Sequence, residues 1–149
     1  MAKLYYSNED LQKDLSEITR QIAVSGWKPD VVIGPGRGAF VMGVMLSHYY
    51  EVPFHGFEWQ TRDHEMIKES TRLETILSKY SMQNILLVDD INDSGKTLKI
   101  IYDLNNPSKI IYNATLIYNQ ESKVKTHFYG KMIKRSEDKN WYVFPWEEW

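Results

Sequence analysis

Cysteine is absent from the sequence, and histidine is scarce. Without thiols the chain can form neither a disulfide framework nor a thiolate zinc site, so we expect it in a reducing cytoplasm. The histidines are His48, His55, His64 and His127. Their scattered positions do not follow the spacing of metal ligands, which argues against a histidine metal site.

Long apolar runs and an excess of one charge are absent as well. The longest apolar stretch, AFVMGVML, is far shorter than the roughly 18 residues that span a membrane. The first residues, MAKLYYSNEDLQ, lack the apolar segment of a secretion signal. A formal net charge of -2 gives no basic field for nucleic acid. We therefore expect a small-molecule partner, with neither a membrane nor a nucleic acid.

The length of 149 residues suits one domain. Such a chain buries roughly two-thirds of its unfolded surface without a metal or disulfide. No repeat, low-complexity segment or linker divides the sequence, so we treat residues 1–149 as a single domain.

Apolar spacing predicts alternating strands and helices. A helix should begin after Ser7 and end near Gly26, because its apolar residues recur at helical intervals. The predicted strands are 31–33, 53–59, 84–89 and 109–118, and the other predicted helices are 39–50, one around 73–77, and 95–104. Nearly continuous apolar strands separated by helices indicate an α/β fold with a mainly parallel sheet covered on both faces. Such sheets bind ligands at the carboxyl ends of their strands.

The most informative segment is NILLVDDINDSGKT, residues 84–97. Its ending is similar to a nucleotide-binding P-loop, but that pattern requires glycine where this chain has Asp90. An aspartate there would also repel a polyphosphate. A receiver domain is the next acidic candidate, but its paired aspartates follow the first strand of the fold, whereas here they follow the third predicted strand. Neither class fits.

A ligand with a phosphate on one side and sugar hydroxyls on the other satisfies both halves of this segment. Backbone amides of residues 93–97, the hydroxyls of Ser94 and Thr97, and the amino end of a helix can hold a phosphate dianion. Asp89 and Asp90 can accept hydrogen bonds from ribose hydroxyls or gather a divalent cation. Ribose 5-phosphate has both features.

The stretch VDDINDSGKT resembles the signature of the type I phosphoribosyltransferases. That signature is an apolar strand, two acidic residues, two variable residues and Asp-[Ser/Thr]-Gly-x-Thr, and every fixed position matches. IGPGRGAFVMGVMLS is similar to the family's pyrophosphate loop and following helix, and WYVFPWE is similar to the tail of its xanthine-guanine and hypoxanthine-guanine branch. The resemblance implies the type I fold, a twisted sheet flanked by helices with a small hood built from the amino- and carboxyl-terminal segments.

The glycine-rich GPGRG is a second candidate anion site, because glycines let backbone amides approach a ligand and Arg37 can grip phosphate oxygens. Two anion sites beside a diol site describe phosphoribosyl pyrophosphate. The resemblance implies that its phosphoribosyl group is transferred to a purine base, with Mg²⁺ bound by Asp89 and Asp90, in part through water. It also implies a non-proline cis peptide beside Arg37.

The expected catalytic residues are Asp93 and Arg37. By resemblance, Asp93 is the proton acceptor or hydrogen-bond partner of the purine imidazole ring, while Arg37 stabilises the departing pyrophosphate. Lys96 lies at a variable position of the signature and contributes charge. The residues expected to bind phosphoribosyl pyrophosphate are Gly36, Arg37, Gly38, Asp89, Asp90, Asp93, Ser94, Gly95, Lys96 and Thr97.

Three residues are expected to bind the base. Trp141 resembles the family's base-stacking aromatic residue, and the backbone of Tyr142 would meet the base edge. Asn119 stands where enzymes for 6-oxopurines carry a lysine, which can only donate. An amide both donates and accepts, so we expect hypoxanthine, guanine or xanthine as the base with weaker discrimination against adenine. We also expect a homodimer or homotetramer.

Two questions remain open from the sequence. The polar segment 58–70 is either a lid that closes on bound substrate or a surface connection. The whole chain is either an enzyme or a regulator of the same fold that binds phosphoribosyl pyrophosphate or a nucleotide without turnover. A regulator acting on nucleic acid should show a basic face, whereas acidic residues interrupt the lysines between 123 and 139.

Overall fold

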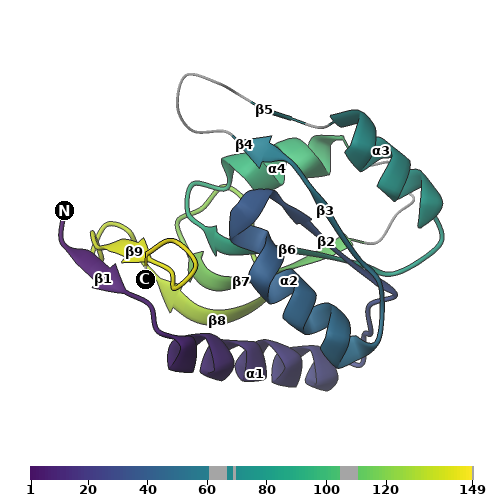
Figure 1. Ribbon diagram of the computed structural model, residues 1–149. Coiled ribbons are helices and arrows are strands. Elements are labelled where there is room, and N and C mark those ends of the chain that lie inside the picture. The colour runs from purple at the N-terminus through teal and green to yellow at the C-terminus, as the bar shows by residue number, and fades with distance from the viewer. Residues whose placement is uncertain (61–66, 69, 105–110, 149) are drawn as a thin grey trace.

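The computed structural model describes residues 1–60, 67–68, 70–104 and 111–148. Its centre is a five-stranded sheet in the order β3-β2-β6-β7-β8 (Figure 1). All four pairings in this sheet are parallel. The strands are β2 (Val31–Pro35), β3 (Phe54–Phe57), β6 (Ile85–Asn92), β7 (Ile111–Asn119) and β8 (Phe128–Ile133). The predicted mainly parallel α/β fold is confirmed.

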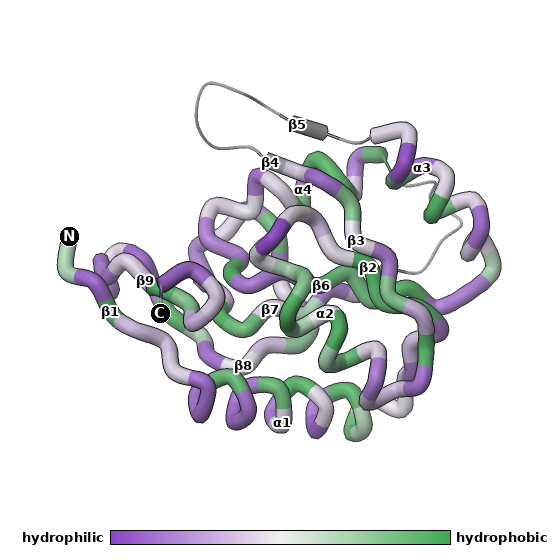
Figure 2. The backbone as a smooth tube through the Cα atoms, in the orientation of Figure 1, coloured by the Kyte–Doolittle hydropathy of each residue, from purple (hydrophilic) through white to green (hydrophobic). Residues whose placement is uncertain are grey.

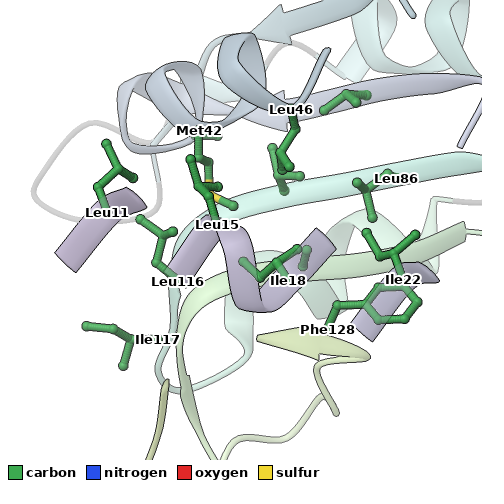
Figure 3. Close-up of a cluster of buried hydrophobic side chains, with 14 of the residues drawn as sticks. Leu11, Leu15, Ile18, Ile22, Met42, Leu46, Leu86, Leu116, Ile117 and Phe128 are labelled. Carbon is green, nitrogen blue, oxygen red and sulfur yellow. The ribbon is translucent and has the colours of Figure 1, made fainter. Parts of the chain in front are cut away.

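Helices cover both faces of the sheet (Figure 1). On β6, Leu86 and Val88 face one apolar cluster while Ile85 and Leu87 face the other. This period of two explains why residues 85–88 of the strand are all apolar. Figure 2 shows the resulting apolar centre, and Figure 3 shows side chains of the first cluster. Helices α1 (Asn8–Ser25) and α2 (Gly36–Tyr50) cover the first face, and α3 (Ser70–Lys79) and α4 (Lys96–Asp103) cover the second.

Helix α1 has the predicted ends. The Ser7 side chain accepts a hydrogen bond from the Asp10 amide, and the Asp10 side chain accepts one from the Ser7 amide. This capping box fixes the amino end. Gly26, with φ 75°, ends the helix in the left-handed region. Ile18, fully buried between the helix and the sheet, anchors the packed face, and replacing it with alanine would cost about 2 to 5 kcal/mol.

Strand β8 was not predicted from the sequence. Residues 120–127 return the chain from β7 to β8 without a helix, whereas parallel crossovers usually contain one. The buried Asn92 holds this return, because its amide donates to the Val124 carbonyl at 2.7 Å and to the Thr126 hydroxyl at 2.8 Å. Strand β6 runs to Asn92, three residues beyond the predicted end at 89, because Ile91 and Asn92 still pair with β7.

The chain ends meet beside the carboxyl edge of the sheet. Strand β1 (Lys3–Tyr5) pairs in parallel with β9 (Trp141–Val143), and Figure 1 shows both to one side of the main sheet. A third pair joins β4 (Trp59–Gln60) to β5 (Ile67–Lys68). Among the described residues, no helix has the length and apolarity that a membrane span would need.

Candidate active site

Four neighbouring strands end at one edge of the sheet, and each delivers polar residues there. Helix α2 follows β2, the acidic segment lies at the end of β6, Asn119 ends β7, and Arg135 follows β8. Because parallel strands share a carboxyl edge, residues far apart in the chain meet there. This edge is the candidate site.

The glycine-rich segment and the acidic segment touch each other. A Cβ atom built on Gly38 would collide with the carboxylate of Asp90, so only glycine permits this approach. Residues 36–38 form the first turn of α2 rather than the separate loop that the sequence suggested. Arg37 is exposed in that turn, and no cis peptide bond occurs among the described residues. The expected cis bond beside Arg37 is therefore not observed.

The two aspartates of β6 are partly buried and hydrogen-bonded locally. The Asp89 carboxylate accepts from the Asp90 amide at 2.9 Å, and the Asp90 carboxylate accepts from the Ile91 amide at 2.7 Å. These bonds orient both carboxylates at the strand end. No group of three or more metal-binding side chains exists among the described residues. A Mg²⁺ ion usually binds one or two carboxylates together with water and substrate phosphate oxygens, and this pair fits such an ion.

The turn between β6 and α4 has a conformation that only glycine adopts easily. Gly95 has φ 84° and caps the helix in the left-handed region, and a Cβ atom there would collide with Ser122 and the backbone of residues 123–124. The Ser94 hydroxyl accepts from the Lys96 amide at 3.2 Å, and the Ser94 carbonyl accepts from the Lys123 amide at 3.1 Å. The amides that open a helix have no partner within it and attract anions.

Asp93 is paired with a residue that the sequence did not identify. Arg135 Nε donates to Asp93 Oδ1 at 2.9 Å, and Nη2 donates to Oδ2 at 3.3 Å. Asp93 is about half exposed (49%), and the Arg135 side chain is less so (23%). Arg135 was not identified because the sequence did not predict β8. Without that strand, nothing placed residue 135 at the sheet edge. A cation just after a strand end was the only available signal.

Asn119 is hydrogen-bonded to the backbone of both members of this ion pair. Its Nδ2 donates to the Asp93 carbonyl at 2.8 Å, while its Oδ1 accepts from the amides of Glu121 at 3.2 Å and Arg135 at 3.1 Å. The residue is only 5% exposed. Base binding by Asn119 therefore remains a prediction that this geometry does not favour, since both ends of the amide hold protein backbone.

The two tail residues expected at the base differ in burial. Trp141 is 41% exposed on β9, and its amide donates to the Ala2 carbonyl at 2.8 Å. Tyr142 is half-buried, and its hydroxyl bonds to the carboxylate of Asp138 at 2.5 Å. Burial, followed by the bond to Asp138, raises the pKa of Tyr142 to about 12. The hydroxyl therefore stays protonated at neutral pH and donates.

The predicted lid falls largely on residues 61–66 and 69, which lie outside the described residues. Just before these residues, Trp59 is buried against Phe57 and the second apolar cluster.

Two surface cavities, of about 220 and 520 Å³, lie beside Trp27 and beside Arg72, and neither contains a predicted site residue.

Comparison with known proteins identifies the family of the chain. The model of the phosphoribosyl transferase domain family matches residues 1–148. The chain belongs to this family. It is therefore a transferase enzyme, as the signature of residues 88–97 predicted.

Its relatives include several purine enzymes. A hypoxanthine-guanine phosphoribosyltransferase of Aquifex aeolicus is 28% identical over 130 residues, covering 81% of this chain and 72% of the relative. The structure of a purine phosphoribosyltransferase from Pyrococcus horikoshii is 25% identical and covers 100% of this chain and 96% of the other, with a TM-score of 0.70. A xanthine-guanine-hypoxanthine enzyme of Helicobacter pylori shares the fold at 23% identity, 96% and 90% coverage, and TM-score 0.70.

Proposed function

We propose that this phosphoribosyltransferase joins the phosphoribosyl group of phosphoribosyl pyrophosphate to a 6-oxopurine base. The observation that carries the proposal is the contact between Gly38 and Asp90, which brings the expected pyrophosphate segment against the expected ribose segment. One ligand can then span both. The names of the Aquifex and Pyrococcus relatives favour a purine as acceptor.

Each end of the donor substrate has a matching group. The 5-phosphate would bind the amides that open α4, and the ribose hydroxyls would donate to Asp89 and Asp90. The pyrophosphate would lie on the first turn of α2 beside Arg37. Magnesium, held by Asp89 and Asp90, would neutralise pyrophosphate charge when bound.

The reaction then needs geometry and charge stabilisation. A purine ring nitrogen attacks the anomeric carbon as the bond to pyrophosphate breaks, and pyrophosphate leaves with the bonding electrons. Asp93 accepts the hydrogen bond, and finally the proton, of the imidazole nitrogen N7. The sugar passes through an oxocarbenium-like state. Arg37 holds the charge that develops on the leaving group.

A pyrophosphate-release assay with phosphoribosyl pyrophosphate, Mg²⁺ and a panel of bases tests the proposal. We expect release with hypoxanthine, guanine or xanthine. The Asp89→Asn/Asp90→Asn double variant should lower kcat/KM by about 100-fold or more, because two charged hydrogen-bond acceptors are lost. Asp103→Asn is the matched control, since Asp103 forms an exposed pair with Lys99 at 3.1 Å on the far end of α4.

The control should retain parental kinetics, and all variants should keep the parental melting temperature within a few degrees. Pyrophosphate release that is unaffected by the double variant would contradict the assignment of the ribose site. Binding of phosphoribosyl pyrophosphate without release for every base would instead support a regulator.

A further inference from the structure

We propose that Arg135 donates a hydrogen bond to the 6-oxygen of the purine base. In enzymes for 6-oxopurines, a lysine at the position of Asn119 is expected to make this bond. The inference rests on the proposed function, because it assumes a purine whose N7 faces Asp93. It begins from the ion pair between Arg135 and Asp93 and from the commitment of Asn119 to backbone groups.

The guanidinium of Arg135 is fixed on three sides. Besides its two bonds to Asp93, its Nη1 donates to the carbonyls of Asn140 at 2.6 Å and Asp138 at 3.3 Å. Its centre lies 5.7 Å from the ring centroid of Tyr142. Because these contacts hold the planar group in one orientation, little side-chain entropy would be lost when a ligand binds.

A count of donors leaves one N–H for a ligand. A guanidinium carries five N–H groups, and the bonds to Asp93, Asp138 and Asn140 use four of them. The second hydrogen of Nη2 has no acceptor among the described residues. Asn119 also has a second Nδ2 hydrogen, but that residue is 5% exposed, whereas the Arg135 side chain is 23% exposed.

The position of this hydrogen matches the edge of a 6-oxopurine. In a purine, the 6-substituent lies next to N7 on the same edge. A base that donates N7–H to Asp93 therefore brings its 6-oxygen to the group beside Asp93, which is Nη2 of Arg135. Asp93 and Arg135 together present one acceptor and one donor, which complement N7–H and the 6-oxygen.

The same pair rejects a 6-amino group. Adenine would direct an N–H at a guanidinium that can only donate. Because the unmatched polar groups would be desolvated without a partner, the preference can be large. The amide at position 119 therefore does not loosen base selection, because the selecting donor comes from the residue after β8.

The test compares base selectivity in the parent, Arg135→Gln and Arg135→Lys. The readout is the ratio of kcat/KM for hypoxanthine to kcat/KM for adenine. Glutamine offers an acceptor as well as a donor, so Arg135→Gln should lower the ratio by about 10- to 100-fold, the value of one charged hydrogen bond. Lysine only donates, so Arg135→Lys should retain most of the ratio.

Arg20→Gln is the matched control. Arg20 also forms a two-bond pair with a carboxylate, to Glu17 at 2.9 and 2.6 Å, but it lies exposed on α1. The Arg20→Gln variant should leave the ratio of kcat/KM for hypoxanthine to kcat/KM for adenine unchanged. A purely positioning role for Arg135, acting through Asp93, would lower kcat/KM equally for both bases. An unchanged ratio in Arg135→Gln would therefore overturn the proposal.

Two further measurements separate this proposal from the proposed function and from misfolding. The ratio of dissociation constants for IMP and AMP should shift in the same direction, and it can be measured even if no base gives turnover. In the parent enzyme, unsubstituted purine should have a kcat/KM about 10- to 100-fold below that of hypoxanthine, because it lacks the accepting oxygen. Equal values for these two bases would overturn the role of Arg135.

Discussion

Replacing Asn119 should destabilise the site rather than alter the choice of base. The Asn119→Ala variant loses the bonds to Asp93, Glu121 and Arg135, whose lengths are 2.8, 3.2 and 3.1 Å. Each bond contributes about 0.5 to 1.5 kcal/mol. Together they predict a loss of about 2 to 4 kcal/mol in the free energy of unfolding, and a melting temperature lower by about 10 °C for a domain of this size.

Urea unfolding and melting temperature measure the stability change, and initial rates measure selectivity. Asn119→Leu removes the same bonds while filling a similar volume, so it separates lost hydrogen bonds from an empty cavity. Asn8→Ala, in an exposed first turn of α1, is the control and should stay within about 0.5 kcal/mol of the parent. The Asn119 variants should lose kcat/KM by one common factor for hypoxanthine and adenine.

The Asn119→Lys variant makes the sharpest distinction. A lysine that faced the base would raise selectivity for oxopurines. A lysine in the observed environment would set a donor against the amides of Glu121 and Arg135, so stability should fall without a gain in selectivity. A variant as stable as the parent, with a changed ratio between hypoxanthine and adenine, would refute this reasoning and place residue 119 at the base.

Two further predictions concern the phosphate segments and pH. Gly38→Ala should raise KM for phosphoribosyl pyrophosphate by about 5- to 100-fold, because the added methyl group would displace the Asp90 carboxylate; an unchanged KM in initial-rate measurements would mean that these segments do not share a ligand. Burial, and then Lys125, lowers the pKa of His127 in the folded protein. The unfolded state therefore binds more protons below about pH 6.5, and the free energy of unfolding should fall as the pH drops below that value. Urea titrations should show a weaker pH dependence in His127→Gln, and an identical dependence would exclude His127 as its source.

Local chemistry accounts for the parts of the structure that the sequence predicted. Helix α1 begins after Ser7 and ends at Gly26, because a side-chain cap and a left-handed residue act over a few neighbouring positions. The nearly continuous apolar residues of β2 and β6 predicted a sheet covered on both faces, and each strand does contribute to both clusters. The acidic turn was located because its signature is contiguous in the chain.

The parts that were missed depend on contacts between distant segments. Strand β8 is short and only partly apolar, and the chain reaches it through a return held by Asn92. Neither periodicity nor a turn motif marks such a return. Arg135 then remained one cation among several in a polar stretch. Its partner Asp93 lies 42 positions earlier in the chain, so no local pattern could join them.

The pairing of Asp93 with Arg135 also suggests why asparagine can occupy position 119. A lysine at the end of β7 could donate to a base but could not accept from the Arg135 amide. Asn119 accepts that bond and donates to the Asp93 carbonyl, so it fixes the backbones of both ion-pair partners. The guanidinium has enough donors to hold Asp93, two carbonyls and one ligand atom at once, whereas an ammonium group with three donors could bind the ligand only by giving up some of these protein contacts. Asn119 and Arg135 therefore depend on each other. Replacing Asn119 would leave buried backbone groups without their hydrogen-bond partner, and replacing Arg135 would leave the base edge without its donor.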